Sequence, residues 1–268
     1  MNRMQRGYLV AIGGAEKKGG DALIIDRIVD LAGGDDGHIV VVPTASRRKD
    51  TADRYAHIFT SRGIGQVSSL TIQSREDAKG EEVLEQLEAA TLVFLTGGKQ
   101  LRLSTVLGGT RVGDCIRRLY KSGIHVAGTS AGAAFLSEHM IAGGRSGATP
   151  TDLSVRLATG LGLTNRLIID QHFRERDRLG RLLAAVALTP YLIGIGLDED
   201  TAVFLGPTGE FEVVGTGGVT VIDPKDMENS TMGKVETGKP VSLSGLRLHS
   251  LAHGARFHTV SNRVTIPS

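Results

Sequence analysis

Short apolar runs alternate with amphipathic segments over the first two thirds of the chain. Five runs have strand length, and all but the third end in glycine or small polar residues; they cover residues 7–14, 38–46, 66–72, 91–98 and 124–130. The segments between them carry apolar residues near helical spacing, in residues 21–33, 50–63, 81–90 and 109–123. Short apolar strands that alternate with amphipathic helices are typical of a parallel sheet covered on both faces. The pattern therefore predicts an α/β fold with a doubly wound, mostly parallel sheet.

The pattern changes after Arg166. It predicts a strand over residues 166–173 and then a helix over residues 174–188. Three further segments have strand character with turns between them, residues 193–205, 210–223 and 240–257. A run of strands after a run of βα units indicates an antiparallel C-terminal extension of the same sheet. Because neither a Pro- or Ser-rich linker nor a repeat interrupts the sequence, we expect one domain over residues 1–268.

Composition and charge remove several classes of function. The 268 residues are 40% hydrophobic and 22% charged, which suits a globular protein. The net charge of +2 gives no nucleic-acid footprint, and no apolar run approaches the roughly 20 residues of a membrane helix. The single cysteine, Cys115, is expected to be a small buried side chain. With no disulfide possible within the chain, and an apolar run at residues 8–12 too short for a secretion signal, we expect a cytoplasmic protein.

Candidate chemistry is expected where the strands end, because ligands of open parallel sheets bind outside the carboxyl ends of the strands. There the sequence GTSAG fits the pattern G-x-S-x-G with Gly128, Ser130 and Gly132. A nucleophile on a tight strand-to-helix turn needs small neighbours, and the following helix directs the Ala131 N–H toward the same point. The motif alone is equally compatible with a plain glycine turn.

A serine hydroxyl needs a base, and the base needs an orienting acid. Among the eight histidines, only His172 ends an apolar strand among polar groups. The next strand offers Asp198, Glu199 and Asp200, of which alternation places Glu199 on the side opposite to its neighbours. The pattern does not decide which side faces His172, and an acidic cluster of this kind is more often solvated than catalytic.

Two further segments have polar groups suited to a substrate. Arg174, Arg178 and Arg181 recur at helical spacing directly after His172, with Arg176 nearby, and guanidinium groups bind carboxylates in bidentate geometry. The simpler interpretation is a solvated helix face. The segment LTGGKQLRL supplies glycine N–H groups for an oxyanion hole and the Gln100 side chain, or only a glycine helix start.

A metal site is not favoured. His249 and His253 stand four residues apart with His258 beyond, but no helical pattern and no H-E-x-x-H glutamate accompanies them. We therefore predict no metal and no cofactor.

Taken in order, the segments IGGAE, VVPTAS, TGGKQLRL, GTSAGAAFLSEHM, DQHFRERDRLGRLL and IGIGLDEDTAV resemble the cyanophycinases. These are serine peptidases related to the aspartyl dipeptidases, with a fold like that of class I glutamine amidotransferases. The resemblance spans nearly the whole chain. It implies Ser130 as nucleophile, His172 as base and Glu199 as the acid, with oxyanion donors at the Gly98 and Ala131 N–H groups.

The resemblance also implies a substrate and the residues that contact it. The substrate is cyanophycin, a poly-aspartate with arginine on each side-chain carboxyl, cut from an end to β-Asp-Arg dipeptides through an acyl-enzyme. The substrate-contacting residues are expected to be Gln100, Asp170, Gln171, Arg176, Arg178 and Arg181. Lys99 departs from the acid or amide expected before the glutamine, which puts fine substrate preference in doubt. The family also suggests a homodimer.

Three rival interpretations remain from the sequence. An esterase would pair Asp198 or Asp200 with one of the later histidines, in the chain order of α/β-hydrolases. An aspartyl dipeptidase would cut small peptides with the same triad. A non-catalytic homologue would only bind the polymer or regulate a partner.

Overall fold

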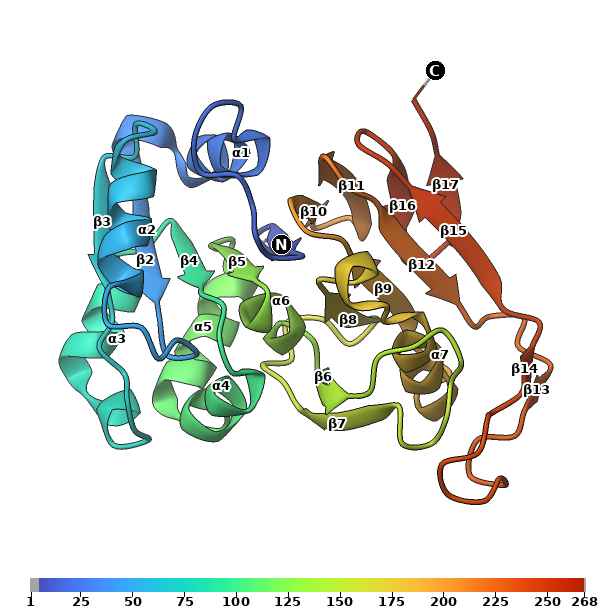
Figure 1. Cartoon of the computed structure of the whole chain (residues 1–268). Helices are drawn as coiled ribbons and strands as arrows, with labels where there is room; N and C mark the ends of the chain where they lie inside the picture. The colour runs from blue at the N-terminus through green and yellow to red at the C-terminus, as the bar shows by residue number, and fades with distance from the viewer. Residues whose placement is uncertain (1–4, 268) are drawn as a thin grey trace.

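The computed structural model describes residues 5–267, and a nine-stranded sheet runs through it (Figure 1). The parallel half of this sheet consists of β1 (Leu9–Ile12), β5 (His125–Thr129), β4 (Leu92–Leu95), β2 (His38–Val42) and β3 (Gln66–Ser69), in that spatial order. The antiparallel half continues from β1 through β10 (Thr201–Leu205), β11 (Glu210–Gly215), β16 (Arg256–His258) and β17 (Arg263–Thr265). The five predicted parallel strands and the antiparallel extension are both present.

Helices cover both faces of the parallel half, as the prediction of a doubly wound sheet requires. On one face α1 (Leu23–Ala32) and α2 (Thr51–Thr60) pack on strand residues such as Val10 and Phe94. The other face, which includes Leu9 and Leu95, is covered by α3 (Glu81–Glu88), α4 (Gln100–Leu107), α5 (Arg111–Lys121) and α6 (Ala131–Phe135). Strand residues alternate between the two faces, so β1, β2 and β4 are buried on both sides, whereas the edge strand β3 is partly exposed. Within residues 5–267, no helix is long and apolar enough to cross a membrane.

A second, four-stranded sheet corrects the expectation that all later strands join the first. Its spatial order is β15 (Arg247–Leu251), β12 (Val219–Asp223), β9 (Ile193–Leu197) and β8 (Leu167–Gln171). One face of this sheet joins the core that contains α6, and the other is covered by α7 (Leu179–Leu188). The chain therefore alternates between sheets, from β9 to β10 and from β11 to β12. The pattern of apolar residues in a strand predicts that the strand is buried, but it does not predict which sheet the strand joins.

The helix predicted over residues 174–188 is wrong in its first turn. Arg174–Arg176 form a short 3-10 helix, and Asp177 then adopts a left-handed backbone (φ 45°) that no α-helix can continue through. Two hairpins were also not predicted, β6 (His139–Gly144) with β7 (Val155–Thr159) and β13 (Asn229–Ser230) with β14 (Leu243–Ser244). The second of them projects at the lower right of Figure 1.

Candidate active site

Ser130 lies in a turn with no space for larger neighbours. It follows β5 directly, precedes α6, and has a positive φ of 52°, which is uncommon for a residue with a side chain. A Cβ at Gly128 would lie 2.5 Å from the Gly132 backbone, and one at Gly132 would lie 2.2 Å from the Leu95 carbonyl oxygen. Both glycines of the G-x-S-x-G pattern are therefore sterically required, and the serine is held in a strained conformation.

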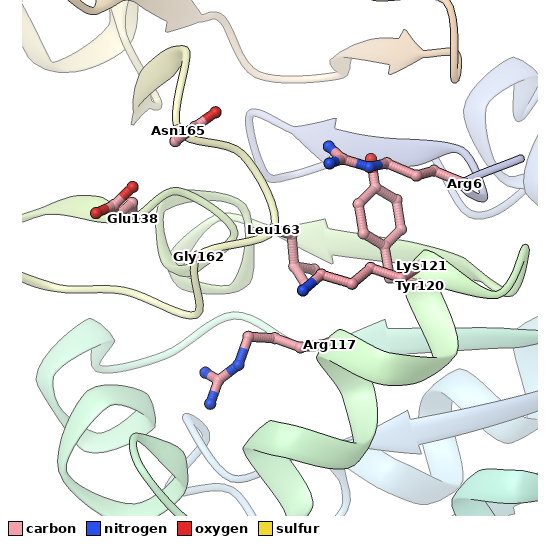
Figure 2. Close-up of a pocket in the computed structure, with 8 residues that line it drawn as sticks. All are labelled: Arg6, Arg117, Tyr120, Lys121, Glu138, Gly162, Leu163 and Asn165. Carbon is pink, nitrogen blue, oxygen red and sulfur yellow. The ribbon is translucent and has the colours of Figure 1, made fainter. Parts of the chain in front are cut away.

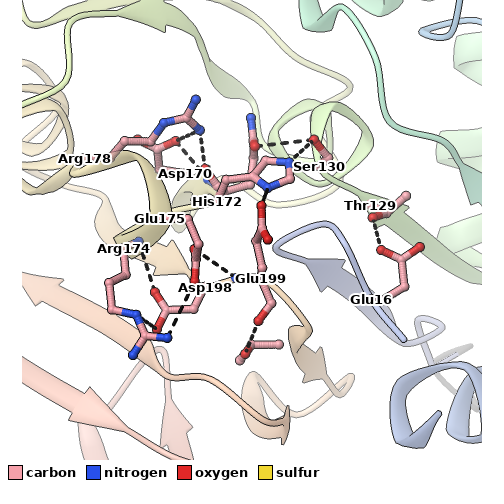
Figure 3. A network of polar contacts seen from close by, with 12 residues as sticks. Glu16, Thr129, Ser130, Asp170, His172, Arg174, Glu175, Arg178, Asp198 and Glu199 are labelled. Atoms are coloured by element: carbon pink, nitrogen blue, oxygen red, sulfur yellow. Dashed lines mark hydrogen bonds and ion pairs between the residues drawn. The ribbon is translucent and has the colours of Figure 1, made fainter. Parts of the chain in front are cut away.

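Two hydrogen bonds join Ser130, His172 and Glu199 in a chain (Figure 3). The Ser130 Oγ lies 2.9 Å from His172 Nε2, and His172 Nδ1 lies 2.6 Å from Glu199 Oε1. Ser130 comes from the end of β5 in the first sheet, whereas His172 and Glu199 follow β8 and β9 of the second. Hydroxyl, imidazole and carboxylate in this order are the arrangement that activates a serine for nucleophilic attack.

The two aspartates beside Glu199 are bonded elsewhere. The Asp198 carboxylate accepts the backbone N–H groups of Arg174 and Gly218, and the Asp200 carboxylate accepts that of Lys17 and the Thr216 hydroxyl. Of the three acids that the sequence left open, Glu199 is the one that contacts the imidazole.

The imidazole of His172 is held from several sides. His172 has a positive φ of 48°, and its backbone N–H donates to the Gly13 carbonyl at 2.9 Å. A Cβ at Gly14 would lie 2.4 Å from the ring, so this glycine packs directly on the imidazole. Burial lowers the pKa of His172, the Glu199 carboxylate raises it again, and the Arg176 charge lowers it. The net lowering keeps the ring in its neutral, proton-accepting form.

The predicted oxyanion donors lie in the turn after β4 and at the start of α6. A Cβ at Gly97 would lie 3.3 Å from Ser130 Cβ, which places this turn against the serine. Gly98 has a φ of 145°, and a Cβ there would lie 2.1 Å from the Ala45 carbonyl oxygen. Ala131 is the first residue of α6, and Gln100 begins α4. The structure thus places Gly97 against the nucleophile and Gly98 against the Ala45 backbone, and the roles of Gly98, Ala131 and Gln100 stay predictions.

The arginine segment differs from a row of exposed guanidinium groups. Arg178 and Arg181 are buried, and both pair with the Asp170 carboxylate, which is 1% exposed. Arg178 also donates to the Gln171 carbonyl, and its Nε is buried without a partner in the described part of the chain. Burial lowers the pKa of Arg178 to about 10.

The four arginines of this segment therefore lie in two different environments. Arg174 and Arg176 are exposed. Arg178 and Arg181 are buried and form an ion-pair cluster with Asp170, two residues before His172. Gln171 lies closer to the reacting atoms, with its Oε1 3.4 Å from Ser130 Oγ. The substrate-contacting roles of these residues stay predictions.

Sequence reasoning missed Glu16, which lies at the carboxyl end of β1 and is 3% exposed. Its carboxylate accepts the Thr129 hydroxyl, one residue before Ser130 (Figure 3). A charged residue shortly after an apolar strand, separated from it by two glycines and Ala15, was the signal available in the sequence.

The later histidines are not paired with the aspartates beside Glu199. Neither Asp198 nor Asp200 has a hydrogen bond to His249, His253 or His258 in the described residues, as the esterase interpretation would require. Within residues 5–267, no group of three or more His, Cys, Asp or Glu side chains is placed to hold a metal ion. Cys115 is buried, and burial raises its pKa.

A basic pocket lies at the other end of the strands. Figure 2 shows Arg6, Arg117 and Lys121 around it, with Glu138 on the other side. Arg6 precedes β1, and Lys121 precedes β5, whereas the triad residues follow the carboxyl ends of their strands. The pocket is therefore not part of the triad site.

Comparisons with known proteins identify the family of this chain. Residues 9–209 match the model of peptidase family S51. A cyanophycinase of Trichormus variabilis is 43% identical over 97% of this chain and 88% of its own length. A cyanophycinase of Geminocystis herdmanii is 40% identical over 96% of both chains.

Among solved structures, a peptidase from an acI-B1 Actinobacterium has a TM-score of 0.65 at 22% identity, over 90% of this chain and 98% of that one. At this identity the similarity concerns the fold alone. The sequence matches go further, and with the match over residues 9–209 they place this chain in peptidase family S51, among the cyanophycinases.

Proposed function

We propose that the protein hydrolyses cyanophycin to β-Asp-Arg dipeptides, with Ser130 as the nucleophile. The observation that carries the proposal is the hydrogen-bonded chain Ser130–His172–Glu199 at 2.9 and 2.6 Å. Its members are pre-aligned across two sheets, so little reorganisation is required before attack. The cyanophycinases that resemble this chain over 96–97% of its length support the choice of polymer.

In the proposed reaction Ser130 Oγ attacks an aspartyl carbonyl of the polymer backbone while His172 Nε2 accepts the hydroxyl proton. Glu199 stabilises the imidazolium that forms, and the N–H groups of Gly98 and Ala131 bind the oxyanion. His172 then gives the proton to the leaving amine. Water, deprotonated by His172, attacks the ester on Ser130. The bond to Oγ then breaks, the product acid leaves, and His172 returns the proton to Ser130 Oγ.

The substrate's charges suit the surroundings of the triad. Each polymer unit carries an arginine α-carboxylate, and the exposed Arg176 lies close enough to His172 to lower its pKa. We propose Gln100, Asp170, Gln171, Arg176, Arg178 and Arg181 as the substrate-binding set. Asp170 acts within it by fixing Arg178 and Arg181, because its own carboxylate is occupied by them.

The proposal also covers the fold type, the oligomeric state and the location of the protein. We assign the fold to the type of class I glutamine amidotransferases. We propose a homodimer and a cytoplasmic location, for which size-exclusion chromatography with light scattering and fractionation of the source cells are the tests.

The experiment is to incubate the purified protein with cyanophycin and identify the soluble products by mass spectrometry. Release of β-Asp-Arg supports the proposal, and Asp-X dipeptides provide the comparison. Cleavage of Asp-X dipeptides with no release from the polymer would instead identify an aspartyl dipeptidase. Polymer binding with no product from either substrate would identify a non-catalytic homologue. Full activity of His172→Ala would favour the esterase interpretation.

A further inference from the structure

The last residue of β1 and the segment that follows it contact the backbone around every member of the triad. Ile12 accepts the Ser130 N–H and Gly13 accepts the His172 N–H, both at 2.9 Å. Gly14 accepts the N–H of Asp200, the residue after Glu199, also at 2.9 Å. This segment therefore joins the two sheets at the point where the triad crosses between them.

Glu16 is the charged side chain buried at the end of this segment, and both of its oxygens are bonded. Oε2 accepts the Thr129 hydroxyl at 2.8 Å, and Oε1 accepts the Tyr55 hydroxyl at 2.6 Å. Lys18 Nζ lies 3.4 Å from Oε1 and supplies a positive charge at the edge of the cluster. Burial and the neighbouring carboxylate raise the pKa of Tyr55 well above its ordinary value, so its hydroxyl keeps the proton that it donates.

Thr129 places this carboxylate next to the strained turn. It is 2% exposed, ends β5, and lies opposite Ile12 in the parallel register. Its hydroxyl is fixed by Glu16 while the next residue, Ser130, adopts the positive φ that directs Oγ to His172. A strained conformation persists only where its surroundings fix it, and here a buried bond to a carboxylate does so one residue away.

We infer that Glu16 is a positioning residue for the nucleophile: through Thr129 and Tyr55 it fixes the Thr129–Ser130 turn in its reactive conformation. It touches neither the substrate nor the reacting atoms. The inference deepens the proposed function and rests on Ser130 being the nucleophile. A buried carboxylate of purely structural value would add to stability and leave the reactivity of Ser130 unchanged.

The decisive variant is Thr129→Val, which removes the hydroxyl at nearly constant volume. The measurement is the rate at which a fluorophosphonate labels Ser130, because this reaction needs no polymer. Misplacing a reacting atom by a fraction of an ångström is costly, so we expect labelling to slow by about 10- to 100-fold. With the polymer as substrate, kcat should fall by a similar factor while KM stays near its original value.

Thr189→Val is the matched control, because it also removes a buried threonine hydroxyl bond, to Ala185 at the end of α7. We expect it to label at the original rate, at a temperature well below both unfolding midpoints. Glu16→Gln keeps the volume and one acceptor oxygen, so it should label faster than Glu16→Ala.

The outcomes separate the two proposals. Equal labelling of Thr129→Val and Thr189→Val, or an original rate for folded Glu16→Ala, would overturn the role of Glu16 alone. Absence of labelling in the unaltered protein would overturn Ser130 as nucleophile and, with it, this inference.

Discussion

The two sheets contribute to the triad in different ways. On the side of the first sheet, Ser130 is fixed by glycines without side chains and by neutral hydroxyls on the Glu16 carboxylate. On the side of the second sheet, His172 lies among charges, with Glu199 on the ring, Arg176 nearby and the Asp170 ion-pair cluster next to it. On the first side, close packing determines the position of Ser130. On the second side, neighbouring charges determine the protonation state of His172.

This difference predicts which kind of change each side tolerates. Variants on the second sheet should respond to pH and salt, because charge interactions govern the imidazole. Substitutions on the first sheet should lower activity when they add volume, because the packed turns have no space for additional atoms. Each variant below tests one side of this division.

The largest effect is expected from Glu199→Gln. The amide cannot stabilise the imidazolium and favours the wrong tautomer, so we expect a loss of about 10⁴-fold in kcat. The acidic limb of the pH profile should also move to lower pH, because Glu199 raises the pKa of His172. Steady-state rates of dipeptide release across pH measure both.

Glu175→Gln is the matched control for that variant. The Glu175 carboxylate accepts the Glu199 N–H at 3.2 Å, and an amide oxygen accepts it equally well. A loss of similar size in both variants would contradict a specific role for the Glu199 carboxylate.

Asp170→Ala should cause the next largest effect, on stability. It leaves the guanidinium groups of Arg178 and Arg181 buried without their carboxylate, which costs about 3–5 kcal/mol of the free energy of unfolding. Urea denaturation measures this cost. Asp114→Ala removes the exposed partner of Arg117 and should cost about 0–1 kcal/mol. Equal effects would mean that the cluster is solvated and its arginines are free.

Gly14→Ala tests the side that depends on volume. The added Cβ would lie 2.4 Å from the His172 ring, so the imidazole must shift and we expect about a 100-fold lower rate of dipeptide release. Gly63→Ala is the control, since Gly63 also has a positive φ (89°, against 103° at Gly14) and a Cβ there has nothing within 4 Å. An unchanged rate in Gly14→Ala would show that the ring moves without cost.

The smallest effect on the pH profile of kcat is expected from Arg176→Gln, whose proposed contact with the substrate should appear separately, as a higher KM. Its charge lowers the pKa of His172, so removing it should raise that pKa and move the acidic limb to higher pH. Because Arg176 is exposed, added salt should reduce the difference from the original protein. A limb that moves in the opposite direction to the one expected would contradict the assigned cause.

The sequence predicted the parallel half of the first sheet because its inner strands are buried on both faces and all five strands alternate with amphipathic helices. It predicted less of the second sheet. The strand ending in Gln171 has the same apolar pattern whichever sheet it joins, and hydrogen-bond partners leave no periodic trace. The helix start after Arg178 was missed because the left-handed turn at Asp177 is a property of the folded backbone.

The site shows the same division. Motif and strand-end position identified Ser130 and His172 as candidates, and the resemblance to the cyanophycinases selected Glu199. Helical spacing alone indicated that Arg178 and Arg181 are exposed, because it cannot predict that the buried Asp170 carboxylate, from another element, pairs with them. Glu16 was missed since its partners, Tyr55 and Thr129, are 39 and 113 residues away.

The most direct test of the central claim is the rate of β-Asp-Arg release from cyanophycin by Ser130→Ala and Ser137→Ala, measured side by side. Ser137 is a buried serine seven residues on, whose hydroxyl has no partner within the described residues, so its loss should leave the rate unchanged. Loss of the nucleophile should lower the rate by about 10⁴- to 10⁶-fold. Release by Ser130→Ala within tenfold of the original rate would contradict the account.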